Sequence, residues 1–204
     1  IGCGSAVYQL FIANKNYSSW SLRPWVLMRA EGIPFEERLT PFSEDPAINH
    51  AAFLKFSPSG KVPCLIDGDF AVWDSLAIAE YLHERHDGVW PADAKARAWA
   101  RSAAAEMHSG FAALRNTCGM NCGIRVKLFD LPDAVATDLA RIEELWGDGL
   151  SRFGGPFLAG KEFTAVDAFY CPVAWRFETY GLANNATSKA YVRTLIEHPA
   201  TMLL

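Results

Sequence analysis

Short apolar runs alternate with a longer helical pattern at the start of the chain. Residues 8–13 predict a buried strand, and residues 35–39 predict a second one. Between them, residues 22–30 predict an apolar helix, which Gly32 ends as the left-handed residue beyond its C-terminus. This alternation indicates a small α/β unit.

A hairpin follows farther along the chain. Residues 62–66 and 70–73 flank Asp67-Gly68-Asp69, whose glycine suits a tight turn between antiparallel strands. Asp74 or Ser75 then caps a helix expected to run to about His86. The predicted order is β-α-β, a connecting segment, and β-β-α.

The pattern becomes helical and alanine-rich after residues 88–93, which have the glycine and proline of a linker. Helices are expected near residues 94–116, 132–153, 164–180 and 189–197. Thr164 and Asp167 form a capping pattern at the start of the third. We therefore expect an α/β domain at residues 6–87 and an all-α domain at residues 94–204.

Pro24 restricts where the first helix begins, because proline is best tolerated in a first turn. The helix is expected to start near Trp20 or Ser21. Its free N–H groups and positive dipole end would then lie beside Ser18, Ser19 and Ser21. This geometry is typical of an anion-binding site.

Composition narrows the function classes. A net charge of −4 over 204 residues, with no dense Lys/Arg run, argues against a nucleic-acid partner. No stretch approaches the roughly 20 apolar residues of a membrane span, so we expect no membrane partner and a cytoplasmic location. Five scattered cysteines, Cys3 among them, predict reduced thiols, and no metal site is expected.

Four motifs in order along the chain resemble the serine-type glutathione transferases, in particular their zeta-like and tau-like bacterial members. They lie at residues 17–23 (Tyr-Ser-Ser-Trp-Ser-Leu-Arg), 59–63 (Ser-Gly-Lys-Val-Pro), 73–78 (Trp-Asp-Ser-Leu-Ala-Ile) and 163–167 (Phe-Thr-Ala-Val-Asp). The zeta class has a cysteine where this chain has Trp20, whereas the tau class has an aromatic residue there.

The resemblance implies a thioredoxin-like first domain, with Pro63 as a cis proline, and a helical second domain that forms part of the pocket for an electrophile. It implies that Val62 pairs with the cysteinyl part of glutathione and that Lys61 faces the glycyl carboxylate. Asp74 and Ser75 would hold the γ-glutamyl end; Asp74 stands where glutamate or glutamine is usual. Glutathione would be the co-substrate.

Ser18 matches the catalytic hydroxyl that donates to the glutathione sulfur in this family, with Ser19 as its neighbouring alternative. Tyr8 and Tyr17 are rival hydroxyls, because other transferase classes use a tyrosine near the end of the first strand. Each site residue also has a simpler interpretation: serines before an apolar helix are common caps, as is Asp74-Ser75. A loop lysine such as Lys61 can be merely solvated.

The predicted function is therefore a glutathione transferase that activates the thiol for attack on a small electrophile. Glutathione-dependent isomerisation or peroxide reduction is the alternative within enzymes, since the same thiolate could serve either. A non-catalytic transferase-like binding protein is the alternative from another class, because fold does not fix function. Family resemblance also implies a homodimer.

Overall fold

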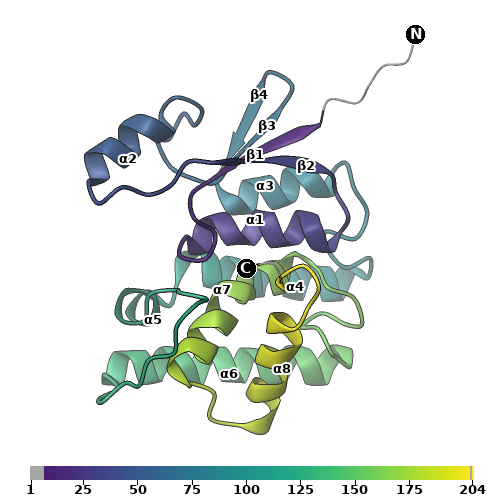
Figure 1. Cartoon of the computed structure of the whole chain (residues 1–204). Helices are drawn as coiled ribbons and strands as arrows, with labels where there is room; N and C mark the ends of the chain where they lie inside the picture. Colours follow the sequence, from purple (N-terminus) through teal and green to yellow (C-terminus); the bar gives the residue numbers. More distant parts are fainter. Residues whose placement is uncertain (1–6, 203) are drawn as a thin grey trace.

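The computed structural model describes residues 7–202 and 204, so Cys3 and the predicted domain start at residue 6 lie outside the described residues. The N-terminal part is a four-stranded sheet with three helices, in the order β1, α1, β2, α2, β3, β4 and α3 (Figure 1). Their bounds are Tyr8–Ile12, Ser19–Ala30, Phe35–Leu39, Pro46–Phe53, Cys64–Asp67, Phe70–Trp73 and Ser75–His83.

The strands lie in the order β2-β1-β3-β4, with β1 parallel to β2 and antiparallel to β3, and β3 antiparallel to β4. Gly68, with φ +64°, makes the predicted turn between β3 and β4. Helices α1 and α3 lie between the sheet and the second domain (Figure 1). This arrangement confirms the predicted α/β thioredoxin-like domain.

Helix α2 was not predicted, because residues 40–61 were expected only to connect the strands. Asp45 caps this helix by accepting a hydrogen bond from the Ala47 amide at 2.8 Å, and Pro46 occupies its first turn. Of its residues only Phe53 is buried, so this short helix lies mostly on the surface.

The regular elements described in the second part are all helices, as predicted: α4 (Ala94–Ser109), α5 (Ala112–Thr117), α6 (Asp133–Phe153), α7 (Ala165–Tyr180) and α8 (Ala186–Ile196). The prediction of a single helix at residues 94–116 is wrong, because two helices cover this range. Phe111 adopts a left-handed φ of 56°, and a side chain at Gly110 would meet the Glu106 carbonyl oxygen at 2.7 Å. The chain therefore breaks between α4 and α5.

Helix α8 begins earlier than the predicted residue 189, because the Asn185 side chain accepts a hydrogen bond from the Ser188 amide at 2.8 Å and caps it. Cys64, Cys118, Cys122 and Cys171 are free thiols, as predicted. No helix among the described residues is both long enough and apolar enough to cross a membrane.

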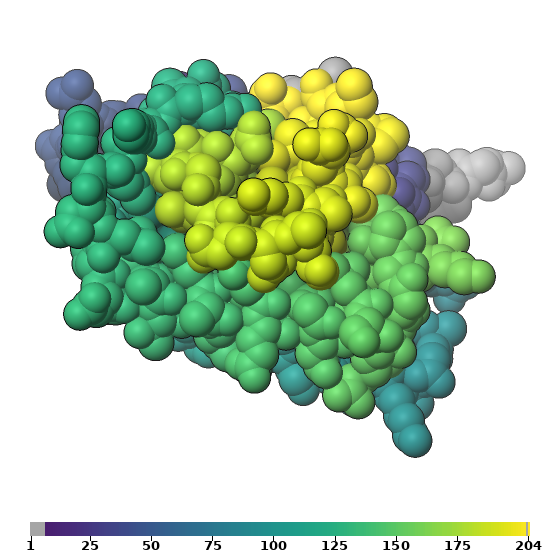
Figure 2. All heavy atoms as spheres, turned by 90° about the horizontal axis from the view of Figure 1, so that it is seen from below, coloured from purple at the N-terminus to yellow at the C-terminus, as the bar shows by residue number. Residues whose placement is uncertain are grey.

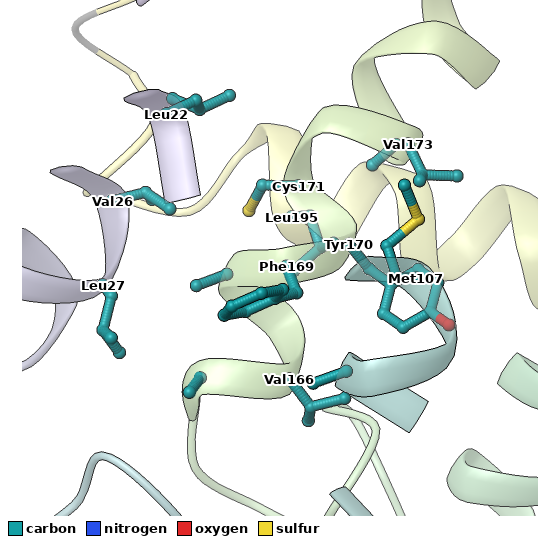
Figure 3. Close-up of a cluster of buried hydrophobic side chains, with 14 of the residues drawn as sticks. Leu22, Val26, Leu27, Met107, Val166, Phe169, Tyr170, Cys171, Val173 and Leu195 are labelled. Carbon is teal, nitrogen blue, oxygen red and sulfur yellow. The ribbon is translucent and has the colours of Figure 1, made fainter. Parts of the chain in front are cut away.

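Helix α7 joins the two domains, since it packs against α1 on one side and against α4 and α8 on the others. Leu22, Val26 and Leu27 of α1 meet Phe169 and its neighbours on α7 in one buried cluster (Figure 3). Figure 2 views the molecule from the side away from the sheet, and this face is formed almost wholly by the helical domain (green to yellow). The domains thus share a continuous apolar core.

Candidate functional site

Ser18 is the N-cap of α1 and lies buried at the end of the loop after β1. Its Oγ accepts a hydrogen bond from the Ser21 amide at 3.4 Å and donates to Ser21 Oγ at 2.9 Å. Ser21 Oγ also accepts from the Ala13 amide at 3.2 Å, which ties the helix start to the end of the first strand. The hydroxyl of Ser18 is therefore held at the positive end of the α1 dipole.

Helix α1 begins at Ser19, one residue earlier than expected, and this places Pro24 in the second turn instead of the first. Proline at that position removes one backbone hydrogen bond within the helix. The free N–H groups of the first turn still lie next to the serines, as the sequence predicted.

Val62 and Pro63 end the loop between α2 and β3, and the Val62–Pro63 peptide bond is cis, as the resemblance implied. Lys61 precedes them and is exposed, whereas Pro63 is buried. Gly60 adopts a φ of +66°, and a side chain there would collide with the His50 ring, so this turn requires glycine. The loop therefore enters β3 along a fixed path.

Asp74 has a left-handed φ of 74°, which is uncommon for a residue with a side chain, and it caps α3. Its Oδ1 accepts a hydrogen bond from the Leu76 amide at 2.9 Å. The neighbouring Ser75 is buried. Strained backbone of this kind clusters at ligand-binding sites, where the surrounding structure maintains it.

Two adjoining cavities bring these residues together. The first, about 470 Å³, is lined by Trp20, Ser59, Lys61, Val62, Pro63, Trp73, Asp74 and Ser75. The second, about 270 Å³, is lined by Ser18, Trp20, Phe42, Pro46, Asn49, His50, Phe53, Gly60, Lys61 and Val62. Trp20, Lys61 and Val62 line both, so the five predicted site residues border one continuous region.

The rival hydroxyls lie elsewhere. Tyr8 Oη is 2.9 Å from His86 Nε2 near the end of α3, and Tyr17 is about half exposed in the loop before α1. Neither tyrosine, nor Ser19, is among the described residues that line the two cavities.

Sequence reasoning missed two residues that contact the site, Arg23 and His108. Arg23 Nη1 donates to Ser75 Oγ at 3.4 Å and lies 3.3 Å from His108 Nδ1. His108 Nε2 lies 3.1 Å from Asp74 Oδ2, although His108 belongs to α4 of the other domain. These residues come from three separate elements, so no local motif could have revealed the contact.

Two models of known protein families match the chain, one in each domain. The model described as "Glutathione S-transferase, N-terminal domain" matches residues 17–85, and the one described as "Glutathione S-transferase, C-terminal domain" matches residues 127–191. The chain belongs to the glutathione S-transferase superfamily.

Individual relatives agree with the family. Glutathione S-transferase 1 from Dianthus caryophyllus is 28% identical over 171 residues, covering 80% of this chain and 74% of that protein. Dichloromethane dehalogenase from Methylorubrum extorquens is 45% identical over 56 residues, which span 28% of this chain but only 19% of the dehalogenase.

Solved structures support the same fold. A glutathione transferase homolog from Burkholderia GL BGR1, crystallised with bound glutathione, has a TM-score of 0.68 and 22% sequence identity, covering 96% of this chain and 94% of that one. Together with the family models, these likenesses confirm the predicted fold class and membership of the glutathione S-transferase superfamily. The serine type and the site residues stay predictions.

Proposed function

We propose that this transferase binds glutathione across the two adjoining cavities and uses Ser18 to activate its thiol for attack on a small electrophile. The observation that carries the proposal is the shared lining of those cavities, which puts Ser18 next to Lys61 and Val62 and within the same region as Asp74 and Ser75. Ser18 is preferred over Ser19 because Ser18 lines the second of these two cavities, whereas Ser19 is not among the described residues that line either.

The site residues suit the three parts of glutathione, which are the glycyl, cysteinyl and γ-glutamyl groups. Lys61 offers a cation for the glycyl carboxylate, and Val62 offers backbone groups for the cysteinyl part. Asp74 offers an acceptor for the γ-glutamyl ammonium, while Ser75, at the first turn of α3, offers a hydroxyl and an N-terminal helix dipole for its carboxylate. Charges of both signs at separate fixed points select a ligand that carries both.

The chemistry follows from the position of Ser18. A free thiol has a pKa near 8.5 and is mostly protonated at neutral pH. A hydroxyl that donates to the sulfur, together with the positive end of α1, stabilises the thiolate and lowers that pKa, each unit being about 1.4 kcal/mol. To reach the sulfur, the Ser18 proton turns away from Ser21 Oγ. The thiolate then forms the carbon–sulfur bond, and the electrophile releases its leaving group.

We also propose that residues 6–87 and 94–204 form the two domains, that the enzyme works in the cytoplasm, and that it is a homodimer. The sequence pattern supplies the domain bounds, the lack of an apolar stretch of membrane-spanning length supplies the location, and the family resemblance supplies the homodimer. Sedimentation of the purified protein measures the last directly, and a monomer would reject it.

The test of the proposed site is calorimetric titration of glutathione into the parent, a Ser18→Ala variant and a Ser19→Ala control, followed by an ultraviolet scan for bound thiolate. All three are expected to bind glutathione, and only Ser18→Ala is expected to lose the thiolate signal. Absence of binding in the parent would reject the site, and loss of the signal in Ser19→Ala alone would move the role to Ser19.

A further inference from the structure

Three arginines from three helices lie close enough to influence one another's pKa: Arg23 of α1, Arg115 of α5 and Arg176 of α7. Arg23 is 0% exposed and Arg176 is 4% exposed. Burial, and then the charges of Arg176 and Arg115, lower the pKa of Arg23 to about 9. Burial and the charge of Arg115 lower the pKa of Arg176 to about 10. The three cations are thus close enough to repel one another.

None of the three arginines forms a salt bridge among the described residues, and the charge of Asp74 offsets only part of the fall in the pKa of Arg23. Arg23 uses Nη1 toward Ser75 and His108, and Arg176 uses Nε toward the Cys118 carbonyl at 2.8 Å. Buried nitrogens without a hydrogen-bond partner remain on all three: Nε and Nη2 of Arg23, Nε of Arg115 and Nη1 of Arg176.

An unpaired buried charge costs several kcal/mol, and most buried cations are therefore paired. A structural role explains only part of this cluster. Arg176 has five N–H donors, and only one of them donates to the Cys118 carbonyl oxygen. Groups in such an unfavourable setting are frequent where a ligand supplies the missing charge.

Trp20 connects the cluster to the cavities. Its ring lies 4.2 Å from Cζ of Arg23 and 5.4 Å from Cζ of Arg115, and the same indole lines both cavities. Arg115 is half-buried, unlike the other two, so it is the member of the cluster that solvent reaches. None of the three arginines is among the described residues that line the cavities, so the Trp20 indole is the side chain between the cavities and Arg115.

We propose that the electrophile carries a carboxylate, which Arg115 binds with support from Arg23 and Arg176. A planar guanidinium matches a carboxylate with two parallel hydrogen bonds, and the neighbouring charges add a favourable field. The inference rests on the proposed function, because it names the class of second substrate for the same thiolate.

The test compares 4-chloro-3-nitrobenzoate with its methyl ester, two electrophiles that differ in one negative charge. In both, the thiolate forms a carbon–sulfur bond at the ring carbon, and chloride leaves with the electron pair of the broken bond. Each kcat/KM is divided by the uncatalysed rate constant. The parent is expected to favour the acid by about tenfold or more, as a hydrogen-bonded charge pair predicts.

Arg115→Gln is expected to reduce the acid-to-ester ratio to about one, and Arg115→Lys to give an intermediate ratio. Arg193→Gln removes the same charge from the exposed face of α8 and is expected to keep the parent ratio. Equal rates for acid and ester in the parent, or the same change in Arg115→Gln and Arg193→Gln, would overturn the proposal.

Affinities of the two synthetic glutathione conjugates, measured by calorimetry, decide the question even where turnover is slow. Tighter binding of the acid conjugate by the parent, lost in Arg115→Gln, supports the carboxylate site. If glutathione binds but both conjugates bind equally, only this inference fails. If glutathione itself does not bind, the proposed function fails, and this inference fails with it.

Discussion

His108 Nε2 lies 3.1 Å from Asp74 Oδ2, so a side chain from the helical domain holds the residue that caps α3 in the thioredoxin-like domain. His108 Nδ1 lies 3.3 Å from Nη1 of Arg23, which also contacts Ser75. One imidazole thus links both residues proposed to bind the γ-glutamyl group. We regard His108 as a positioning residue.

Removal of His108 is expected to weaken glutathione binding. A typical hydrogen bond contributes about 1 kcal/mol, so His108→Ala should raise the dissociation constant for glutathione about fivefold in calorimetry. His86→Ala is the matched control, because His86 contacts Tyr8 and lines neither cavity. Equal losses in the two variants would show that His108 has no special role.

Asp74 should tolerate asparagine better than alanine. Asparagine keeps a side-chain acceptor for the Leu76 amide, whereas alanine loses the cap and keeps the positive φ. We expect Asp74→Ala to lower the free energy of unfolding by about 1–2 kcal/mol and Asp74→Asn by less, measured by urea denaturation. The reverse order would show that the cap does not govern stability here.

Glu31 should make stability fall as pH rises. Burial, and then the charges of Glu162 and Asp167, raise the pKa of Glu31 to about 7 from an ordinary value of 4.5. The folded state therefore binds the proton more tightly, and its advantage is complete below pH 4.5 and lost between pH 4.5 and 7.

Glu31→Gln is expected to be more stable than the parent at pH 8, by about 1 kcal/mol once solvent screening of this partly exposed group is allowed for, and equally stable near pH 4. Thermal unfolding across that range measures the difference. A gap independent of pH would contradict the assignment.

Asp167 should be among the residues most important for stability. Its Oδ1 accepts hydrogen bonds from the Leu158 amide at 3.0 Å and from Tyr191 Oη at 2.7 Å, and its Oδ2 accepts from the Thr164 amide at 3.0 Å. Asp167→Ala leaves three buried donors unpaired, so we expect a loss of about 3 kcal/mol or more in the free energy of unfolding.

Tyr191→Phe is a milder variant for comparison with Asp167→Ala, because it removes only the hydrogen bond that Tyr191 donates to Asp167. A loss of about 1–1.5 kcal/mol is expected in the same urea experiment. A loss as large as that of Asp167→Ala would mean that the tyrosine, and not the carboxylate, anchors the start of α7.

The elements predicted from the sequence are those with local signals. The strands, the Gly68 turn and the starts of α1 and α7 each depend on residues close together in the chain. Helix α2 is short and mostly exposed, and the Asp45-Pro46 pair was the local signal of its start. The break at Gly110 was hidden because the alanine-rich helical pattern continues on both sides of it.

The same distinction applies to the site. Ser18, Lys61, Val62, Asp74 and Ser75 each lie in a motif of five to seven residues, so resemblance alone could select them. Arg23 and His108 are 85 positions apart, and Arg115 and Arg176 come from two further helices. Their proximity depends on how α4, α5 and α7 pack against α1, which no short pattern encodes.

The interruption at Gly110 and Phe111 separates α4 from α5, so the position of one helix can change without moving the other. If α4 continued straight, residue 115 would lie about 9 Å farther along its axis than residue 109, at 1.5 Å per residue. His108, before the interruption, contacts the glutathione side of the site, whereas Arg115, after it, contacts Trp20. A change of length or angle at this joint would move the arginine and leave the histidine in place. Related enzymes could then differ in the electrophile they prefer, while they all recognise glutathione in the same way.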